Sequence, residues 1–318
     1  MNGIGSKVGL GILLVLFTAL ISGVSTFVNF WAVQGANSDA FITARNLLVA
    51  GLLVPLFFLA RSSVRSRLGR DDWLRLIVIG LIGGAIPFLL FFRGLQMAGA
   101  AGAPTATFGY RMLFLLATVM AVVFLKERFS WRVGIAAGLI LGGNALLLSL
   151  TATVWADGTL FVLAATVLWA SEYTLSKRTL SGLPSTTVAL ARMGFGGLFL
   201  FGYLVVSGQL AAVSALTAAQ LQWIGISALL LVAFVMTWYA GLRHVDVSVA
   251  TSVLVLGFPI TLVLDVLASR KPLSLPQAAG VVVIAFGVVL VVGLASLRET
   301  WVYLDRVVRA RLGSLSWK

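Results

Sequence analysis

The chain has 318 residues, of which 60% are hydrophobic and only 10% are charged, and its net charge is +13. A soluble domain carries about 25% charged residues, so this composition excludes a soluble globule and indicates an integral membrane protein. Cysteine is absent and histidine occurs once. These counts exclude thiol catalysis, disulfides and a zinc or haem site built on such ligands, so we expect no cofactor and no metal.

Ten apolar segments follow along the chain, each close to the roughly 20 residues that cross a bilayer as a helix. No interruption between them could hold a soluble domain, so we expect one transmembrane domain over residues 1–298. Residues 299–318 combine apolar and basic side chains at helical spacing, which predicts a basic amphipathic tail or a loosely ordered one. The predicted spans are 8–33, 40–60, 74–97, 101–124, 132–151, 158–177, 185–207, 221–242, 247–268 and 276–296.

Lysine and arginine concentrate in alternate loops, a pattern typical of loops that stay in the cytoplasm. If the N-terminus is inside, the basic loops near Arg67, Arg128, Arg178 and Arg243 are cytoplasmic, and so is the tail. Both termini are then cytoplasmic. Because membrane topology accounts for the basic residues, we do not expect nucleic acid as a partner.

The sequence also contains an internal duplication. One shift of 147 positions relates four consecutive segments, and a shift of 144 relates the turns that follow spans four and nine. Each half has five spans, so the copies must run in opposite senses, as in secondary transporters that bind substrate between inverted repeats. We therefore expect an all-α fold of ten transmembrane helices, with repeat one over 8–151 and repeat two over 158–296 around a central cavity. The paired positions include Ser22 with Trp169, Ser25 with Glu172, Asn29 with Ser176, and Arg45 with Arg192.

The segments LKERFSWRVGIAAGLILGG and SRKPLSLPQAAGVVVIAFG each join a charged turn to a span rich in small residues. Together with Trp169-Ala170-Ser171, they resemble the EamA family of the drug/metabolite transporter superfamily and, more particularly, bacterial amino-acid exporters of the YddG type. The resemblance implies a central cavity and export of small metabolites across the bacterial inner membrane. Glu127 is matched by Lys271, and Pro259 by Leu115, so gating need not be symmetric.

Polar side chains at helical spacing predict the substrate site. Stripes on spans one and six correspond under the duplication, and Arg111 of span four could pair with Glu172 to offset the cost of burying both charges. The alternative is that the hydroxyls pack helices together and that the pair is structural. The predicted substrate-binding residues are Ser22, Ser25, Asn29, Tyr110, Arg111, Trp169, Glu172, Tyr173 and Ser176.

Other residues have structural interpretations. Arg45 and Arg192 are expected to snorkel or to bond to helix carbonyls, and Trp238 and Tyr239 to form an interfacial belt. The stripe Gly134-x-x-x-Gly138-x-x-x-Gly142 predicts close helix packing, as scaffold or as a homodimer seam.

The sequence favours a secondary transporter rather than an enzyme, with a small solute and the lipid bilayer as its partners. Arginines outnumber acids within the spans, which suits a carboxylate-bearing solute, and the aromatic residues suit an apolar side chain. Amino acids, including aromatic and apolar ones, are therefore the first choice, moved by alternating access. A phosphate-bearing metabolite or nucleotide-sugar exchanger could use the same cations. A membrane-embedded transferase would need several His or Asp residues at one interface, and a passive channel would not need inverted halves.

Overall fold

The computed structural model describes residues 4–32, 37–60, 68–148, 157–270, 272–293, 296–298 and 300–305, and strands are absent from these residues. The helices are α1 (Ile4–Ala32), α2 (Ser38–Ala60), α3 (Arg70–Ile79), the π-helix η2 (Gly80–Ala85), α4 (Ile86–Arg111), α5 (Leu113–Met120), the π-helix η3 (Ala121–Leu125), α6 (Trp131–Leu147), α7 (Thr159–Thr179), α8 (Ser185–Val206), α9 (Ala211–Ser214), α10 (Ala218–Leu242), α11 (Val247–Leu254), α12 (Gly257–Ser269) and α13 (Leu275–Val292).

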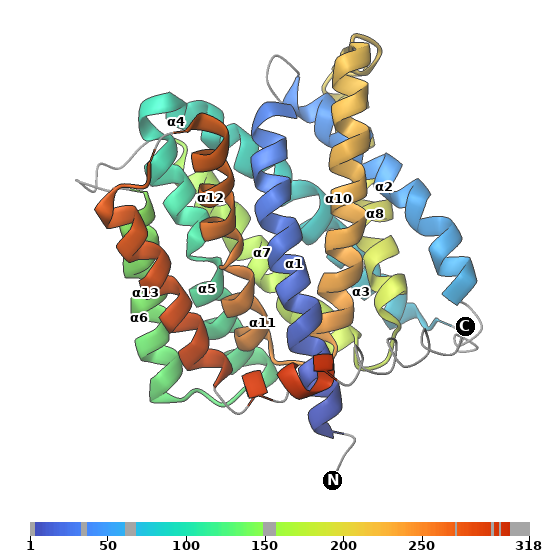
Figure 1. Ribbon diagram of the computed structural model, residues 1–318. Helices are drawn as coiled ribbons and strands as arrows, with labels where there is room; N and C mark the ends of the chain where they lie inside the picture. Colours follow the sequence, from blue (N-terminus) through green and yellow to red (C-terminus); the bar gives the residue numbers. More distant parts are fainter. Residues whose placement is uncertain are drawn as a thin grey trace, which may run out of the picture.

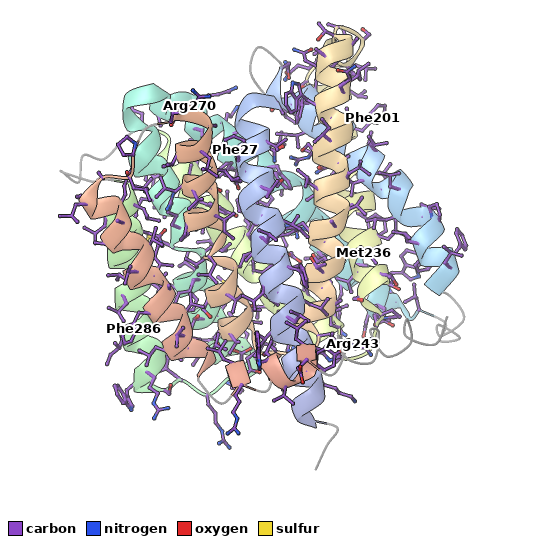
Figure 2. The ribbon with its side chains drawn as sticks, in the orientation of Figure 1. Phe27, Phe201, Met236, Arg243, Arg270 and Phe286 are labelled. Carbon is purple, nitrogen blue, oxygen red and sulfur yellow. The ribbon has the colours of Figure 1, made fainter. Side chains whose placement is uncertain are left out.

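Nine helical stretches in the described part of the chain are long and apolar enough to cross a membrane, and the shorter α6 is also apolar. Large apolar side chains point outward from the bundle, among them Phe201 and Phe286 (Figure 2). Such a surface suits lipid. These observations confirm the predicted all-α membrane fold, in which α6 completes the set of ten predicted spans.

The bundle has two ends, which we name by their residues (Figure 1). The basal end holds the start of α1, the end of α7 and the turn after α10, where Arg243 lies (Figure 2). The distal end holds the end of α1, the start of α7 and the end of α12, next to Arg270 (Figure 2). The helical residues 300–305 lie at the basal end with the N-terminus (Figure 1). Residue 299 and residues 306–318, which complete the predicted tail, lie outside the described residues.

Two helix crossings show how the copies are inverted. Gly11 of α1 packs against α10 at the basal end, where a Cβ on Gly241 would lie 3.1 Å from the Gly11 carbonyl oxygen. At the distal end Gly158 packs against α4, where a Cβ on Gly94 would lie 2.7 Å from the Gly158 carbonyl oxygen. Both pairs are related by the shift of 147, from Gly11 to Gly158 and from Gly94 to Gly241. Equivalent glycines thus allow equivalent close contacts at opposite ends.

The shift of 144 also relates irregular backbone in the two copies. Lys126 and Arg270 both adopt the left-handed conformation, with φ of 59° and 55°. Helical geometry is interrupted at Met112, between α4 and α5, and at the equivalent Leu256, between α11 and α12. Each repeat therefore contains one discontinuous helix, a feature that transporters with inverted repeats use to place helix ends beside a solute.

Two glycines of the α6 stripe do not make the predicted close packing within the chain, and the homodimer alternative stays a prediction. A Cβ placed on Gly138 or Gly142 would have no neighbour within 4 Å. The contact between α6 and α13 instead uses Gly143, whose Cβ would lie 2.9 Å from the Gly280 carbonyl oxygen. The helix is rotated from the predicted orientation, because the more closely packed face carries Ala136, Ile140 and Gly143.

Candidate functional site

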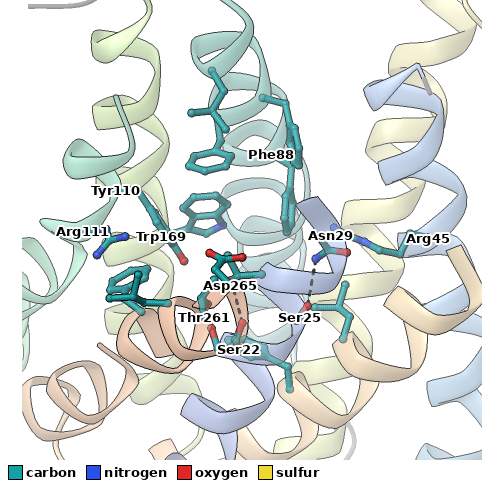
Figure 3. Close-up of a pocket in the computed structure, with 18 of the residues that line it drawn as sticks. Ser22, Ser25, Asn29, Arg45, Phe88, Tyr110, Arg111, Trp169, Thr261 and Asp265 are labelled. Carbon is teal, nitrogen blue, oxygen red and sulfur yellow. Dashed lines mark hydrogen bonds between the residues drawn. The ribbon is translucent and has the colours of Figure 1, made fainter. Parts of the chain in front are cut away.

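A cavity of about 540 Å³ lies between the two repeats, in the distal half of the bundle. Its wall comes from the second half of α1 and from α12, together with parts of α2, α4, α6, α7, α8 and α10. Seven predicted site residues line the cavity, and six of them are labelled in Figure 3, with Tyr173 as the seventh. These are Ser22, Ser25, Asn29, Tyr110, Arg111, Trp169 and Tyr173.

Aromatic rings form one wall of the cavity. The Trp169 ring centroid lies 5.4 Å from that of Phe88, 5.6 Å from that of Phe91 and 5.3 Å from that of Tyr110. The indole Nε1–H donates to the Gly83 carbonyl at 3.1 Å, so the polar edge of the ring is satisfied within the protein. Rings held in this way give a rigid apolar surface to a ligand at small entropic cost.

Arg111 lies on another side of the cavity, at the end of α4. Its Nη1 donates to Asn144 Oδ1 at 2.8 Å, and its guanidinium carbon lies 4.3 Å from the Phe258 ring centroid. The Nε–H has no hydrogen-bond partner among the described residues. The predicted pair with Glu172 does not form. Arg111 is therefore held by neutral groups and makes no ion pair with any described residue.

The serine and asparagine stripe of α1 lines the cavity as predicted. Asn29 Nδ2 donates to Ser25 Oγ at 3.1 Å, and Asn29 Oδ1 accepts a hydrogen bond from Ser227 Oγ at 2.6 Å. Ser22 lies one turn nearer the basal end and also lines the cavity. These contacts orient the stripe along the cavity wall.

Glu172 and Ser176 lie behind the cavity wall rather than in it, which differs from the prediction. Glu172 is completely buried; its Oε1 accepts hydrogen bonds from Ser176 Oγ at 2.5 Å and Tyr239 OH at 2.7 Å. Its Oε2 lies 3.8 Å from Nη1 of Arg192. The helical rotation that brings Trp169 into the cavity turns Glu172 toward α8 and α10. The buried charge is therefore paired with Arg192 and not with Arg111.

The two arginines related by the duplication both line the cavity. Arg192 Nη2 donates to the Gly83 carbonyl at 3.2 Å, as the carbonyl-bonding interpretation predicted. Arg45 donates twice to Asn46 Oδ1, each at 3.2 Å, and lies 5.2 Å from the Phe88 ring centroid. Each residue is only 4% exposed, so the snorkelling interpretation is wrong.

The π-helix η2 provides the backbone acceptors of this site. The carbonyl oxygen of Gly83 accepts from Trp169 and Arg192, and that of Gly84 accepts from Asn46 at 3.1 Å. A Cβ on Gly83 would lie 2.5 Å from Glu172 Cγ, so only glycine allows α7 to approach this closely. Widened helical turns of this kind are frequent at functional sites because they free carbonyl groups.

At the basal end, charged side chains form hydrogen bonds with backbone groups of neighbouring helices and hold these helices together. Glu127 accepts from the backbone N–H of Val247 at 2.7 Å and of Ser248 at 3.2 Å, at the N-terminus of α11. Lys177 Nζ donates to the carbonyls of Leu242 at 2.8 Å and Val245 at 2.7 Å. Trp238 and Tyr239 are fully buried nearby, so they do not form the predicted interfacial belt. No cavity-lining residue comes from this end.

Sequence reasoning did not assign Arg45, Arg192, Phe88 or Asp265 to the site, although all four line the cavity. For the arginines a signal was available, because a charge kept within a span at the same position of both copies is costly in lipid and calls for a role inside the bundle. For Phe88 and Asp265 no sequence pattern fixed which side of the helix faces inward.

The fold and the cavity define a class: a multi-pass membrane protein with inverted repeats around a central binding volume. The chain belongs to the EamA-like transporter family, which matches it twice, over residues 9–149 and over residues 157–293. It is therefore a membrane transporter of the drug/metabolite superfamily.

A solved structure, titled only as a crystal structure of a protein, has the same fold, with a TM-score of 0.72 at 20% sequence identity. The similarity covers 91% of this chain and 98% of the other. No curated protein matches the sequence.

Proposed function

We propose that this protein exports small carboxylate-bearing metabolites, and amino acids in particular, by alternating access. The observation that carries the proposal is a cavity that combines the guanidinium of Arg111 with a rigid aromatic wall around Trp169. Arg111 lines the cavity while its Nη1 is bonded to Asn144, and we expect the guanidinium to hold a solute carboxylate by charge-assisted hydrogen bonds. The aromatic wall would pack against an apolar or aromatic side chain.

The asymmetry of the bundle supports alternating access. The cavity belongs to the distal half, while contacts of Glu127 and Lys177 hold the basal helix ends together. The interruptions at Met112 and Leu256 give each repeat a place where half a helix can tilt. In the opposite state the basal contacts would separate and the distal ones would close.

We infer that the basal end is cytoplasmic in the bacterial inner membrane. Basic side chains gather there on α1, on the turns beside α6 and α8, and on the turn after α10, as short cytoplasmic loops require. Both termini would then be cytoplasmic, and the cavity of this conformation would face outward. For an exporter this is the state that releases solute.

An exchanger of phosphate-bearing metabolites is the second candidate, and the three cavity-lining arginines, Arg45, Arg111 and Arg192, favour it. A phosphate would be held at the same guanidinium groups, but a sugar phosphate has no aromatic or apolar group to pack against the aromatic wall. The two functions therefore predict different responses to Trp169→Ala.

Counterflow in liposomes reconstituted with the purified protein tests the proposal. Vesicles loaded with unlabelled solute should accumulate labelled amino acid from outside, with aromatic and branched amino acids preferred to small ones. Labelled sugar phosphates and nucleotide sugars form the comparison set. Accumulation of phosphate esters without accumulation of any amino acid would contradict the proposal and establish the second candidate.

A further inference from the structure

Asp265 is an acidic side chain that lines the cavity and has no partner in the described part of the chain. It lines the cavity on α12, and no hydrogen bond or ion pair joins it to any described residue. The residue is exposed and lies four residues before the end of α12, so a solute can reach it, and acidic residues in membrane-spanning segments are usually paired or functional. Glu172 illustrates the paired case, with Tyr239, Ser176 and Arg192 around it.

The duplication does not require an acid at this position. Under the shift of 144, Asp265 corresponds to Ala121, which is completely buried in η3. The fold therefore forms the equivalent turn with an alanine. Only the second repeat has a carboxylate at this position, which borders the cavity.

The orientation of Asp265 is set by the contact between α12 and α1. Phe258, Thr261, Leu262 and Asp265 recur at helical spacing and all line the cavity. Thr261 Oγ1 donates to the Gly23 carbonyl of α1 at 2.9 Å, and a Cβ on Gly23 would lie 2.6 Å from Ile260. With the helices in such close contact, the next turn of α12 places Asp265 beside the cavity-lining stripe of α1 (Figure 3).

The cavity thus presents opposite charges that do not pair with each other. Arg192 is paired with Glu172, Arg45 is bonded to Asn46, and Arg111 makes no ion pair with any described residue. Asp265 has free acceptors and makes no ion pair with any of these arginines. A solute carboxylate alone would satisfy Arg111 but would add a second anion to the space that Asp265 borders. A zwitterion carries a group of the right charge for each of them, since an ammonium group supplies three donors to a carboxylate.

We propose that Asp265 binds the ammonium group of the solute and is the residue that selects amino acids over the corresponding simple carboxylic acids. This inference rests on the proposed function and adds the second charge of the substrate. The site selects by repulsion as well as by attraction, because Asp265 opposes a ligand that carries only negative charge. Phosphate esters without an amine are disfavoured for the same reason.

The test compares three ligands that share a phenyl ring: phenylalanine, 3-phenylpropionate, which lacks the ammonium, and phenethylamine, which lacks the carboxylate. Calorimetric titration of the detergent-purified full chain gives their dissociation constants. The unmodified protein should bind phenylalanine most tightly. Asp265→Asn should weaken phenylalanine roughly ten- to hundredfold, as loss of a hydrogen bond to a charged group implies, and should not weaken 3-phenylpropionate.

Further variants separate a binding role from a structural one. Asp265→Glu keeps the charge and should keep the preference for phenylalanine. Arg111→Gln should weaken phenylalanine and 3-phenylpropionate alike. Asp157→Asn, at an exposed acid at the start of α7, outside the cavity, should change neither. Elution profile and melting temperature show whether each variant is folded.

The outcomes distinguish the two proposals. If the unmodified protein binds 3-phenylpropionate as tightly as phenylalanine, or if folded Asp265→Asn keeps the preference, the role of Asp265 is overturned while the proposed function stands. If the unmodified protein binds neither carboxylate, the proposed function fails and the inference fails with it.

Discussion

The basal end and the distal half of the bundle are built from equivalent helices, but their charged side chains differ in whether they have partners. At the basal end Glu127 and Lys177 are bonded to backbone groups of the turn between α10 and α11 and the start of α11. In the distal half Arg111 has an unpartnered Nε–H and Asp265 makes no hydrogen bond in the described part of the chain. Under the two shifts, Glu127 corresponds to Lys271 and Lys177 to Phe30. The two copies thus differ at the positions whose charged side chains hold the basal helices together, and we infer that these differences leave charged groups available to a ligand in the distal half.

The largest expected effect comes from the buried pair behind the cavity. Glu172→Ala leaves Arg192 buried without its counter-charge, and breaking such a pair costs about 3–5 kcal/mol. The equivalent position in repeat one, Ser25, provides the matched control, and Ser25→Ala should cost far less. Thermal unfolding in detergent measures both. Equal destabilisation by the two variants would show that the pair contributes nothing special.

A second variant should open the basal end. Glu127→Ala removes the carboxylate that accepts hydrogen bonds at the N-terminus of α11. Hydrogen bonds to a charged group contribute about 1.5–3 kcal/mol. Their loss is enough to shift the equilibrium between the closed and open basal end about tenfold or more. Thr18, completely buried one turn below Ser22, reports this change. In a chain without native cysteine, Thr18→Cys should react with a thiol reagent faster when Glu127 is replaced. Asp71→Ala, which replaces an exposed acid on α3, is the control. If Asp71→Ala accelerates the reaction of Thr18→Cys equally, or if Glu127→Ala does not accelerate it, Glu127 does not hold the basal end closed.

The comparison of the two ends also shows how far sequence reasoning reached. The lengths of the apolar segments predicted the membrane spans, and the constant shifts between similar segments predicted the inverted repeats. Both predictions depend only on distance along the chain. The faces of α1 were predicted correctly from helical spacing. The rotation of α7 that turns Glu172 away from the cavity was not, since it depends on contacts with Gly83 and Tyr239 from distant segments. The same reason explains why Arg111 was assigned the wrong partner and why Asp265 was missed.

Within the distal half, two variants should separate the aromatic wall from the cationic site. Trp169→Ala should weaken bulky apolar amino acids roughly tenfold, as expected when a large aromatic contact residue is truncated, and small ones less. Arg111→Gln should weaken all carboxylates to a similar degree. Competition against labelled phenylalanine in counterflow measures both profiles. The assignment of the cavity would be wrong if both folded variants kept the solute profile and affinity of the unmodified protein.

The smallest expected effect is a pH dependence at the basal end. Partial burial, followed by the charges of Arg243, Lys177 and Lys7, lowers the pKa of His244 from its usual 6.5. The unfolded chain therefore binds a proton more readily, so His244 contributes stability above pH 6.5 that is lost as the pH falls through its lowered pKa. His244→Gln should flatten the fall in melting temperature between about pH 7.5 and 5.5. A pH profile identical to that of the unmodified protein would contradict this.

The most direct test of the central claim is protection of a single cysteine in the cavity. Ser22→Cys lies in the cavity wall, and the protein has no other cysteine. In right-side-out vesicles an impermeant thiol reagent should modify this cysteine from outside, and phenylalanine should slow the reaction in proportion to its occupancy of the site. A cysteine that reacts only from the cytoplasmic side, or that phenylalanine and the other amino acids leave unprotected, would contradict an outward-facing amino-acid site.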